Sequence, residues 1–392
     1  MTIIGEARPK VYSAGGDRLG TMRIALMGTR GVPARYGGFE TAVEEIGQRL
    51  VERGHDVTVY CRDGGPDAPT EHLGMHLVHL SAVHSKAVET LSHTGLSTVH
   101  AMTHRRPDAA IVFNAANAPF LPLLRARGIP VATHVDGLEW KRAKWAGAGR
   151  RYYLLAERLA VKWSDALIAD APAIADYYLE KFGAKTNLIA YGAPILTGLG
   201  TDYLDSIGVA SRKFHLAVAR FEPENHVDLA VAGYLASDAQ CPLLVVGSAP
   251  YADRYTSLVR ELAGRDDEIR LIGSVWNQDD LDQLYAHALT YVHGHSVGGT
   301  NPSLLRAMGA ATAVSAYDVS FNREVLGDHG RYFTDAASLA GVLNRAEADP
   351  AAAVERGRRL QERARTRYRW DHVTDGYEDL CRRLAGKSRT RP

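Results

Sequence analysis

The residues best suited to chemistry form a glycine-rich turn at 294–301, with the sequence Gly-His-Ser-Val-Gly-Gly-Thr-Asn. An apolar, strand-like run at 288–293 precedes this turn, and a helix-like run begins at Pro302. Asn301 is a favourable helix N-cap and Pro302 suits the first turn. The start of such a helix presents unpaired N–H groups at the positive end of the helix dipole. The segment therefore predicts a site for an anionic group, above all phosphate; the alternative is an ordinary strand–turn–helix joint.

A second glycine-rich region lies near the beginning of the chain. Residues 22–27 form a buried-type strand, and residues 28–33 (Gly-Thr-Arg-Gly-Val-Pro) form a turn. The Tyr-Gly-Gly of residues 36–38 leads into a helix predicted over 41–53, and a strand follows at 56–61. This βαβ unit implies a parallel sheet. The dinucleotide fingerprint Gly-x-Gly-x-x-Gly is absent from the turn, which disfavours a nicotinamide enzyme.

Strands and helices alternate along the rest of the chain in two series. Further strands are predicted at 109–113, 130–134, 166–169, 214–219, 242–246, 269–272, 290–293 and 313–316, and helices of the second series at 227–235, 251–263, 278–288 and 302–309. A chain of 392 residues is too long for one ordinary core. We therefore predict an α/β fold of two Rossmann-like, doubly wound domains. They face each other across a cleft at the carboxyl ends of both sheets, where ligands bind.

Four segments follow from this division. We predict a flexible tail over 1–21, a first Rossmann-like domain over 22–205 and a second over 206–368. The last segment, 369–392, is predicted as an amphipathic helix that packs back on the first domain.

Composition narrows the class of protein. A hydrophobic content of 46% and a charged content of 23% are typical of a soluble globular protein. The formal net charge of +1 gives no reason to expect a nucleic-acid partner. The sequence has no run of 18 apolar residues that could span a membrane, and its first 22 residues do not resemble a signal peptide. Three scattered cysteines without metal-ligand spacing favour the reducing cytoplasm.

Several motifs together carry a family resemblance. They are residues 27–33 (Met-Gly-Thr-Arg-Gly-Val-Pro), 36–40 (Tyr-Gly-Gly-Phe-Glu), 134–142 (His-Val-Asp-Gly-Leu-Glu-Trp-Lys-Arg), 191–194 (Tyr-Gly-Ala-Pro), 218–225 (Val-Ala-Arg-Phe-Glu-Pro-Glu-Asn) and 294–308. Over about 22 to 385 the chain resembles retaining glycosyltransferases of the GT-B fold in family 4. It looks most similar to the subgroup described as rhamnosyltransferases of surface-polysaccharide assembly.

The resemblance implies a donor site for a nucleotide-diphosphate sugar in the second domain and an acceptor site in the first. Gly37 and Gly38 match a glycine loop near the donor phosphates or the acceptor, where a bulky Cβ would keep backbone N–H groups away. Arg220 matches a diphosphate-binding arginine. A helix-entry turn, and an ion pair of Arg220 with Glu222 or Glu224, are the structural alternatives. The expected donor-binding residues are Gly37, Gly38, Arg220, Glu224, Asn225, Gly298, Gly299, Thr300, Asn301, Ser303 and Arg306.

The same resemblance implies catalytic and acceptor contacts at the ends of strands in the first domain. The expected catalytic residues are His134, Asp136 and Arg220, and the expected acceptor-binding residues are Tyr36, Asn114, Asn117 and Glu139. A histidine at a strand end is otherwise a structural residue with satisfied hydrogen bonds, and Asp or Asn after a strand otherwise forms turns.

The sequence departs from the family pattern in two ways. The family carries two glutamates across the glycine-rich turn where this chain has Gly298 and Arg306, and a lysine where it has Asn225. Arginine only donates hydrogen bonds, so Arg306 cannot accept them from a nucleotide ribose. Four interpretations stay open for Arg306: a shifted cation for the diphosphate, a donor without the ribose 2′-hydroxyl such as a deoxythymidine-diphosphate sugar, weak or lost transferase activity, or an ordinary surface arginine.

The resemblance also implies a mechanism without a protein nucleophile. The acceptor attacks from the front face, and the leaving phosphate takes its proton, so the protein positions the substrates and stabilises charge. No cofactor and no metal are expected, because helix N-termini and arginine can balance the diphosphate and no Asp-x-Asp motif ends a strand.

Residues 140–163 combine seven Lys or Arg residues with interleaved Trp and Tyr, opposed only by Glu157. A basic amphipathic segment with aromatic residues is typical of a membrane-surface contact. It predicts peripheral binding to an anionic membrane at the inner face of the cell membrane; the alternative is a solvated helix face.

We therefore predict a glycosyltransferase that moves a sugar, with rhamnose as one candidate, from a nucleotide-diphosphate donor to a glycan or lipid-linked glycan acceptor with retention of configuration. Two alternatives remain at this stage. One is a non-catalytic partner of another transferase that binds a nucleotide sugar, and the other is a nucleotide-sugar epimerase of the same fold.

Overall fold

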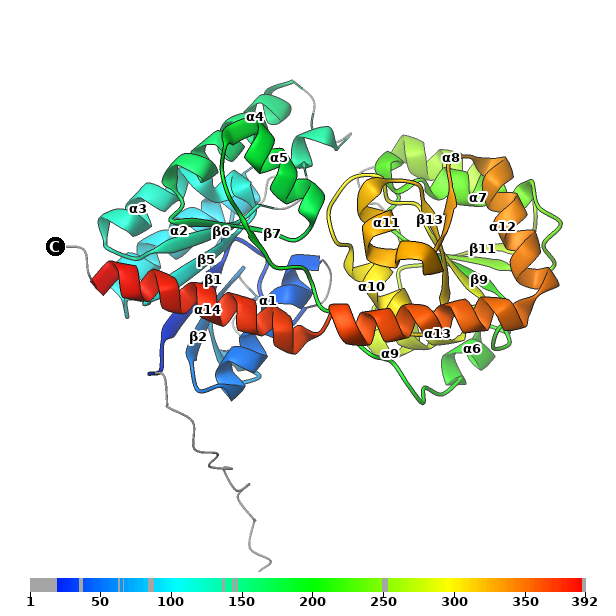
Figure 1. Cartoon of the computed structure of the whole chain (residues 1–392), viewed down its shortest axis with the longest axis horizontal. Coiled ribbons are helices and arrows are strands. Elements are labelled where there is room, and N and C mark those ends of the chain that lie inside the picture. The colour runs from blue at the N-terminus through cyan, green and yellow to red at the C-terminus, as the bar shows by residue number, and fades with distance from the viewer. Residues whose placement is uncertain are drawn as a thin grey trace, which may run out of the picture.

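The computed structural model describes residues 20–34, 38–62, 64–65, 67–83, 88–135, 138–142, 145, 147–248 and 253–389. Two α/β domains lie side by side, and two long C-terminal helices run end to end along both of them (Figure 1). Each domain is built on a largely parallel sheet with helices on its faces, which confirms the predicted fold class.

The first domain contains a sheet with the strand order β3-β4-β2-β1-β5-β6-β7-β8, in which only the β3–β4 pair is antiparallel. Its strands are β1 (Arg23–Met27), β2 (Asp56–Arg62), β3 (Glu71–His72), β4 (Met75–Leu80), β5 (Ala109–Phe113), β6 (Val131–His134), β7 (Ala166–Ala169) and β8 (Asn187–Leu188). Its helices are α1 (Gly38–Glu52), α2 (Glu89–Thr103), η1 (Ala115–Phe120), α3 (Leu121–Ala126), η2 (Glu139–Lys141), α4 (Ala148–Trp163) and α5 (Pro172–Phe182).

The second domain contains a parallel sheet with the order β11-β10-β9-β12-β13-β14. Its strands are β9 (His215–Val218), β10 (Leu243–Val246), β11 (Ile269–Gly273), β12 (Thr290–His293), β13 (Ala313–Tyr317) and β14 (Arg331–Phe333). The helices are α6 (Asp202–Ser206), η3 (Pro223–Asn225), α7 (Val227–Leu235), α8 (Asp253–Ala263), α9 (Gln278–His287), α10 (Pro302–Gly309), α11 (Ser320–Leu326), η4 (Gly327–His329), α12 (Ala336–Ala348) and α13 (Pro350–Arg367). The last helix, α14 (Trp370–Arg389), packs on the first domain.

Apolar patterning explains both kinds of element. Every residue of β5 is buried, as expected for a parallel strand covered by helices on both faces. Helix α1 buries Ala42, Val43, Ile46 and Leu50 on one side, at the spacing of a single helical face.

The chain crosses between the domains at two places that touch each other. Gly192, at the first crossing, lies so close to Trp370 that a Cβ atom would fall 2.3 Å from the indole ring. The N–H of Ala193 donates to the carbonyl of Tyr368, at the second crossing, over 2.7 Å. Beyond this point α14 returns along α1 of the first domain (Figure 1).

A buried apolar cluster continues from one domain into the other. It contains Ile24 and Phe113 of the first domain, Leu305 and Met308 of the second, and Tyr377 of α14. Burial of apolar surface therefore helps to hold the domains together. Within the described residues, no helix has both the length and the apolar character that crossing a membrane requires.

Candidate active site

The carboxyl ends of both sheets meet where the domains touch, and two helices begin there. A Cβ atom on Gly38, the first residue of α1, would lie 2.9 Å from Cγ of Pro302, the first residue of α10. Asn301 caps α10: its Oδ1 accepts from the Ser303 N–H at 2.9 Å and from the Ser303 hydroxyl at 2.7 Å. Two helix N-termini that face each other concentrate positive potential, which suits an anionic group.

The glycine-rich turn after β12 also contacts the first domain. Gly298 adopts a φ of +142°, in the region that favours glycine, and its Cα faces open space. The next residue, Gly299, packs against Asp170, which follows β7 of the first domain. The Thr300 hydroxyl donates to the Asp170 carbonyl at 2.7 Å. The turn thus joins the two domains beside the start of α10.

Arg220 follows β9 and is the partly exposed cation of this region. Its side chain is 39% exposed, and one Nη lies 3.6 Å from Oε1 of Glu222. The ion pair considered from the sequence therefore exists, but it leaves much of the guanidinium accessible. Asn225 is buried, and its Nδ2 donates to the Arg220 carbonyl at 2.9 Å. In the structure, Asn225 thus supports the turn that carries Arg220.

Carboxylates from both domains surround Arg142 of the first domain. Its guanidinium lies 2.5 Å from Oε1 of Glu139, 4.0 Å from Oε2 of Glu222 and 3.9 Å from Oε1 of Glu224. Glu139 also accepts from the indole N–H of Trp145 at 3.3 Å. Glu224 is buried, so its charge is balanced across the interface between the domains rather than by water.

His134 is enclosed by aromatic rings. It stacks between Phe113 and Tyr191, with ring centroids at 5.5 and 5.7 Å, and Phe39 contacts it edge-on at 5.3 Å. The residue is fully buried, and within the described residues neither ring nitrogen has a hydrogen-bond partner. Burial lowers the pKa of His134 to about 3, so the imidazole is neutral at physiological pH.

Replacing His134 by phenylalanine is expected to reduce the loss of stability on acidification. The unfolded chain protonates this imidazole near its ordinary pKa of 6.5, whereas the folded protein does so only near about 3. Between these values the unfolded state binds more protons, so stability falls as the pH falls. At about pH 5, protonation of this one imidazole in the unfolded chain lowers the free energy of unfolding by about 2 kcal/mol. Urea unfolding at about pH 7.5 and 5 measures the difference; an equal loss in wild type and variant would contradict a neutral buried His134.

Two further histidines lie at the end of β12 and at the beginning of the glycine-rich turn, and neither was predicted as a site residue from the sequence. His293 and His295 stack with ring centroids 4.4 Å apart, and Nδ1 of His293 lies 3.3 Å from the Tyr291 hydroxyl. Burial lowers the pKa of His293 to about 3 and that of His295 well below its ordinary value. Their signal was a His-x-His pair where strand β12 enters the turn. Asp170 and Arg142 were missed as well; Asp170 directly follows a predicted strand.

The structure places several other predicted residues away from the domain interface or in structural roles. Arg306, in the last turn of α10, is 17% exposed and pairs with Asp282 of α9. Asn114 caps η1 by accepting from the Ala116 N–H at 2.8 Å. Asn117 is fully buried, and its Nδ2 donates to the Phe113 carbonyl at 2.8 Å. Substrate contacts of these three residues therefore stay predictions. Tyr36, Gly37 and Asp136 lie outside the described residues.

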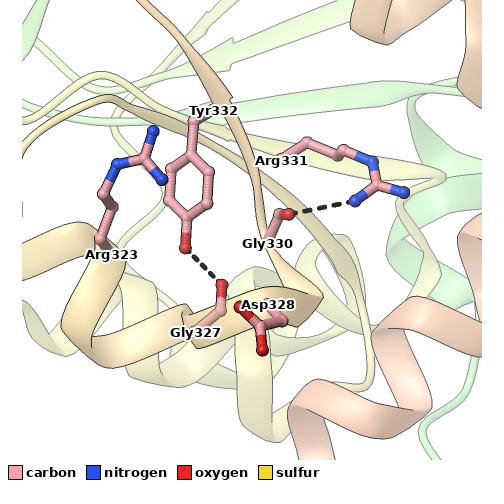
Figure 2. A pocket seen from close by; sticks show the side chains of 6 residues that line it. All are labelled: Arg323, Gly327, Asp328, Gly330, Arg331 and Tyr332. Carbon is pink, nitrogen blue, oxygen red and sulfur yellow. Dashed lines mark hydrogen bonds between the residues drawn. The ribbon is translucent and has the colours of Figure 1, made fainter.

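A separate polar cavity of about 490 Å³ lies at the other end of the second sheet (Figure 2). Gly330 and Arg331 line it where β14 begins, so it is not at the carboxyl ends of the strands. The Tyr332 hydroxyl donates to the Gly327 carbonyl at 2.6 Å, and the Arg323 guanidinium lies over the Tyr332 ring at 4.4 Å. These groups are engaged within the domain and include none of the predicted site residues.

The fold and this interface define a class of proteins in which two α/β domains with parallel sheets meet along one face. Residues 37–192 match the family described as a glycosyl transferase 4-like domain, and residues 207–367 match the family described as glycosyl transferases group 1. The chain therefore combines these two glycosyltransferase domains and is a glycosyltransferase of the GT-B type.

Known proteins of this type match nearly the whole chain. The alpha-maltose-1-phosphate synthase of Mycolicibacterium smegmatis is 26% identical over 407 residues, which span 93% of this chain and 100% of that protein. The solved structure of sucrose-phosphate synthase from Thermosynechococcus elongatus has a TM-score of 0.78 at 22% identity, covering 93% of this chain and 100% of the other. That of HepE from Anabaena in complex with UDP-glucose has a TM-score of 0.73 at 15% identity, covering 92% and 99%. The likeness to these two structures concerns the fold.

Proposed function

We propose that this protein transfers a sugar from a nucleoside-diphosphate donor to a glycan or lipid-linked glycan acceptor, with retention of configuration. One observation carries the proposal: the first residues of α1 and α10 lie in contact, and the accessible guanidinium of Arg220 acts electrostatically on His295 in the turn that leads into α10. In this proposal the diphosphate binds between these helix starts and Arg220 stabilises it as it leaves. HepE, a protein of the same fold, has been solved with UDP-glucose.

The side chains around Arg220 and the glycine-rich turn favour charge stabilisation over nucleophilic catalysis by the protein. His134, His293 and His295 are buried and neutral, and the carboxylates near Arg220 lie beside Arg142. In the proposed reaction the acceptor hydroxyl attacks the face from which the diphosphate departs, and the departing phosphate oxygen takes the proton. We propose that neither a metal ion nor another cofactor is needed.

Arg306 bears on the identity of the donor. Its guanidinium is neutralised by Asp282, and arginine offers no acceptor to a ribose hydroxyl. A donor without the 2′-hydroxyl loses the least binding energy when this acceptor is missing. We therefore propose a deoxythymidine-diphosphate sugar as donor, with rhamnose as the first sugar to test. The Arg306–Asp282 pair would then be structural and support α10 from the side.

For the acceptor we propose a lipid-linked glycan reached at an anionic membrane surface, at the inner face of the cell membrane. Within residues 140–163, helix α4 exposes Arg151, Leu155, Arg158 and Lys162 along one side, and in the described part of the chain the three cations of this side pair with no carboxylate. The lone Glu157 points inward and bonds to Tyr177 and Lys181. Elsewhere in the same domain, an apolar groove of about 650 Å³ is lined by Ser81, Ala82, Val83, Val88, Leu91, Ser92, Gly95, Leu96 and Phe120. Cations beside exposed apolar side chains suit anionic lipid.

Replacing Arg151 and Arg158 by alanine is expected to weaken binding to vesicles that contain anionic lipid by about 30-fold, since each cation near such a surface contributes about 1 kcal/mol. Cosedimentation with phosphatidylglycerol–phosphatidylcholine vesicles measures the change. Arg254→Ala with Arg260→Ala on α8 is the matched control, because both residues are exposed on the other domain. Equal loss in both double variants would show a general charge effect instead of a docking face.

Thermal stabilisation by the diphosphates of uridine, deoxythymidine, guanosine and adenosine tests the donor site. A ligand that binds only the folded protein, at about 100 times its Kd, adds about 2.7 kcal/mol of stability. Stabilisation by one base, followed by release of that diphosphate from the corresponding sugar donor when acceptor is added, supports the proposal. Stabilisation without any turnover would favour the non-catalytic partner role, for which Arg306 and Asn225 are the reasons in the sequence.

A further inference from the structure

Asp170 is buried where the glycine-rich turn of the second domain meets the first domain. It directly follows β7, is 3% exposed, and faces Gly299. A Cβ atom on Gly299 would lie 2.3 Å from one carboxylate oxygen of Asp170 and 2.7 Å from the other. The turn can approach this closely only because residue 299 is glycine. The Thr300 hydroxyl holds the same point by donating to the Asp170 carbonyl at 2.7 Å.

Among the residues that the structure describes, no cation forms an ion pair with the carboxyl group of Asp170. Its Oδ1 is buried without a hydrogen-bond partner in the described part of the chain. The other ionisable groups that act on it are acids: Glu324 of α11 and Tyr377 of α14. Burial and the charge of Glu324 raise the pKa of Asp170, the backbone N–H groups of Asp170 and Thr300 lower it, and the result is about 7.

We propose that Asp170 is a proton-binding latch: in its protonated form it seats the glycine-rich turn 294–301 against the first domain, and donor binding therefore takes up a proton. Asp170 is a positioning residue, since it acts on the donor through the turn. The latch itself depends only on the contact between the domains. The donor step rests on the function proposed above.

Electrostatics links the latch to the donor. The proposed diphosphate site begins at Pro302, within a few residues of the turn that covers Asp170. An ionised carboxylate buried there repels the diphosphate through a medium of low dielectric constant, whereas a neutral carboxyl group does not. Binding of the diphosphate therefore favours the protonated form, and the proton comes from solvent. It returns to solvent when the diphosphate leaves and the turn separates from the first domain.

A double-mutant cycle without any ligand tests the latch contact. In the wild-type background, Gly299→Ala forces a methyl group onto the Asp170 carboxyl group and is expected to lower the melting temperature by about 5 °C. In the Asp170→Ala background that space is free, so the same change is expected to lower it by about 1 °C or less. Additive effects of the two substitutions would overturn the proposed contact. Because no nucleotide is present, the outcome does not depend on the proposed function.

Titration calorimetry in two buffers of different ionisation enthalpy tests the proton. With the nucleoside diphosphate that stabilises the protein, wild type at about pH 7.5 is expected to take up about half a proton more than Asp170→Asn, whose amide cannot ionise. Wild-type affinity is also expected to fall above about pH 7, while that of Asp170→Asn changes less. Equal proton uptake in both would overturn the coupling. If Asp170→Asn does not fold, Glu324→Gln replaces it: removing that acid lowers the pKa of Asp170 and is expected to shift the pH dependence downward.

Discussion

Replacing Arg220 by alanine is expected to weaken the binding of a nucleoside diphosphate about 100-fold and to leave the binding of the nucleoside nearly unchanged. A charge-assisted hydrogen bond to phosphate contributes about 1.5–3 kcal/mol, and a guanidinium fork can make two of them. Arg220 is placed for this role because its side chain is 39% exposed and its ion pair with Glu222 spans 3.6 Å. Titration of the variant with the diphosphate and with the nucleoside of the same base measures the two losses.

Arg270→Ala is the matched control for this experiment. Arg270 is also in the second domain, is 40% exposed and lies 3.5 Å from a carboxylate, that of Glu268. It differs from Arg220 in lying on β11, the edge strand of the sheet, and not after β9 beside the strand that leads to α10, so its removal is expected to change neither affinity. Equal weakening of nucleoside and diphosphate by Arg220→Ala would remove Arg220 from the phosphate site.

Replacing Glu378 by glutamine is expected to lower the free energy of unfolding by about 2–3 kcal/mol at neutral pH. The carboxylate of Glu378 on α14 accepts from Arg53, which directly follows α1, at 2.9 Å and from Arg382 at 2.6 Å, and His55 lies 3.1 Å away. Burial alone would raise its pKa, but Arg382, Arg53 and His55 outweigh this effect and lower it to about 2. The pairing therefore stabilises the protein above the unfolded pKa of about 4.5, and this stabilisation is lost as the pH falls toward about 2.

Urea unfolding of wild type and variant over the acid range checks this prediction. Glu355→Gln is the control, because Glu355 pairs with Arg359 at 3.0 Å on the solvent side of α13 and is 50% exposed. Exposed pairs of this kind contribute about 0–1 kcal/mol. If Glu378→Gln cost no more than the control, the ion pairs between α1 and α14 would not contribute to docking of the C-terminal helix.

The periodic parts of the fold could be predicted from sequence, whereas short and polar elements could not. β5 and α7 have the predicted bounds, because a continuous apolar run and a helical repeat leave few alternatives. The β3–β4 hairpin was not predicted. β4 carries two histidines within six residues, and β3 is only two residues long, so neither has a strong strand pattern.

The candidate site shows the same contrast: contacts between residues close in sequence could be predicted, and contacts between residues far apart in sequence could not. The Asn301 cap was predicted because its hydrogen bonds reach only to Ser303, two residues along the chain. Arg306 was predicted at the donor site, but its guanidinium bonds to Asp282, on another helix. The contact of Asp170 with Gly299 likewise joins residues of two domains. Partners on another helix or another domain cannot be found from residue spacing within one segment. The roles of these residues therefore became clear only from the three-dimensional structure.

The two chain crossings also limit how the domains can move. Because Ala193 bonds to Tyr368 and Gly192 lies against Trp370, the two crossings are tied to each other at one place. A rotation of one domain against the other keeps these contacts only if it turns about this place, whereas a rotation about a distant axis would break them. The relative orientation of the two domains is therefore constrained by the paired crossings as well as by the apolar cluster that the domains share.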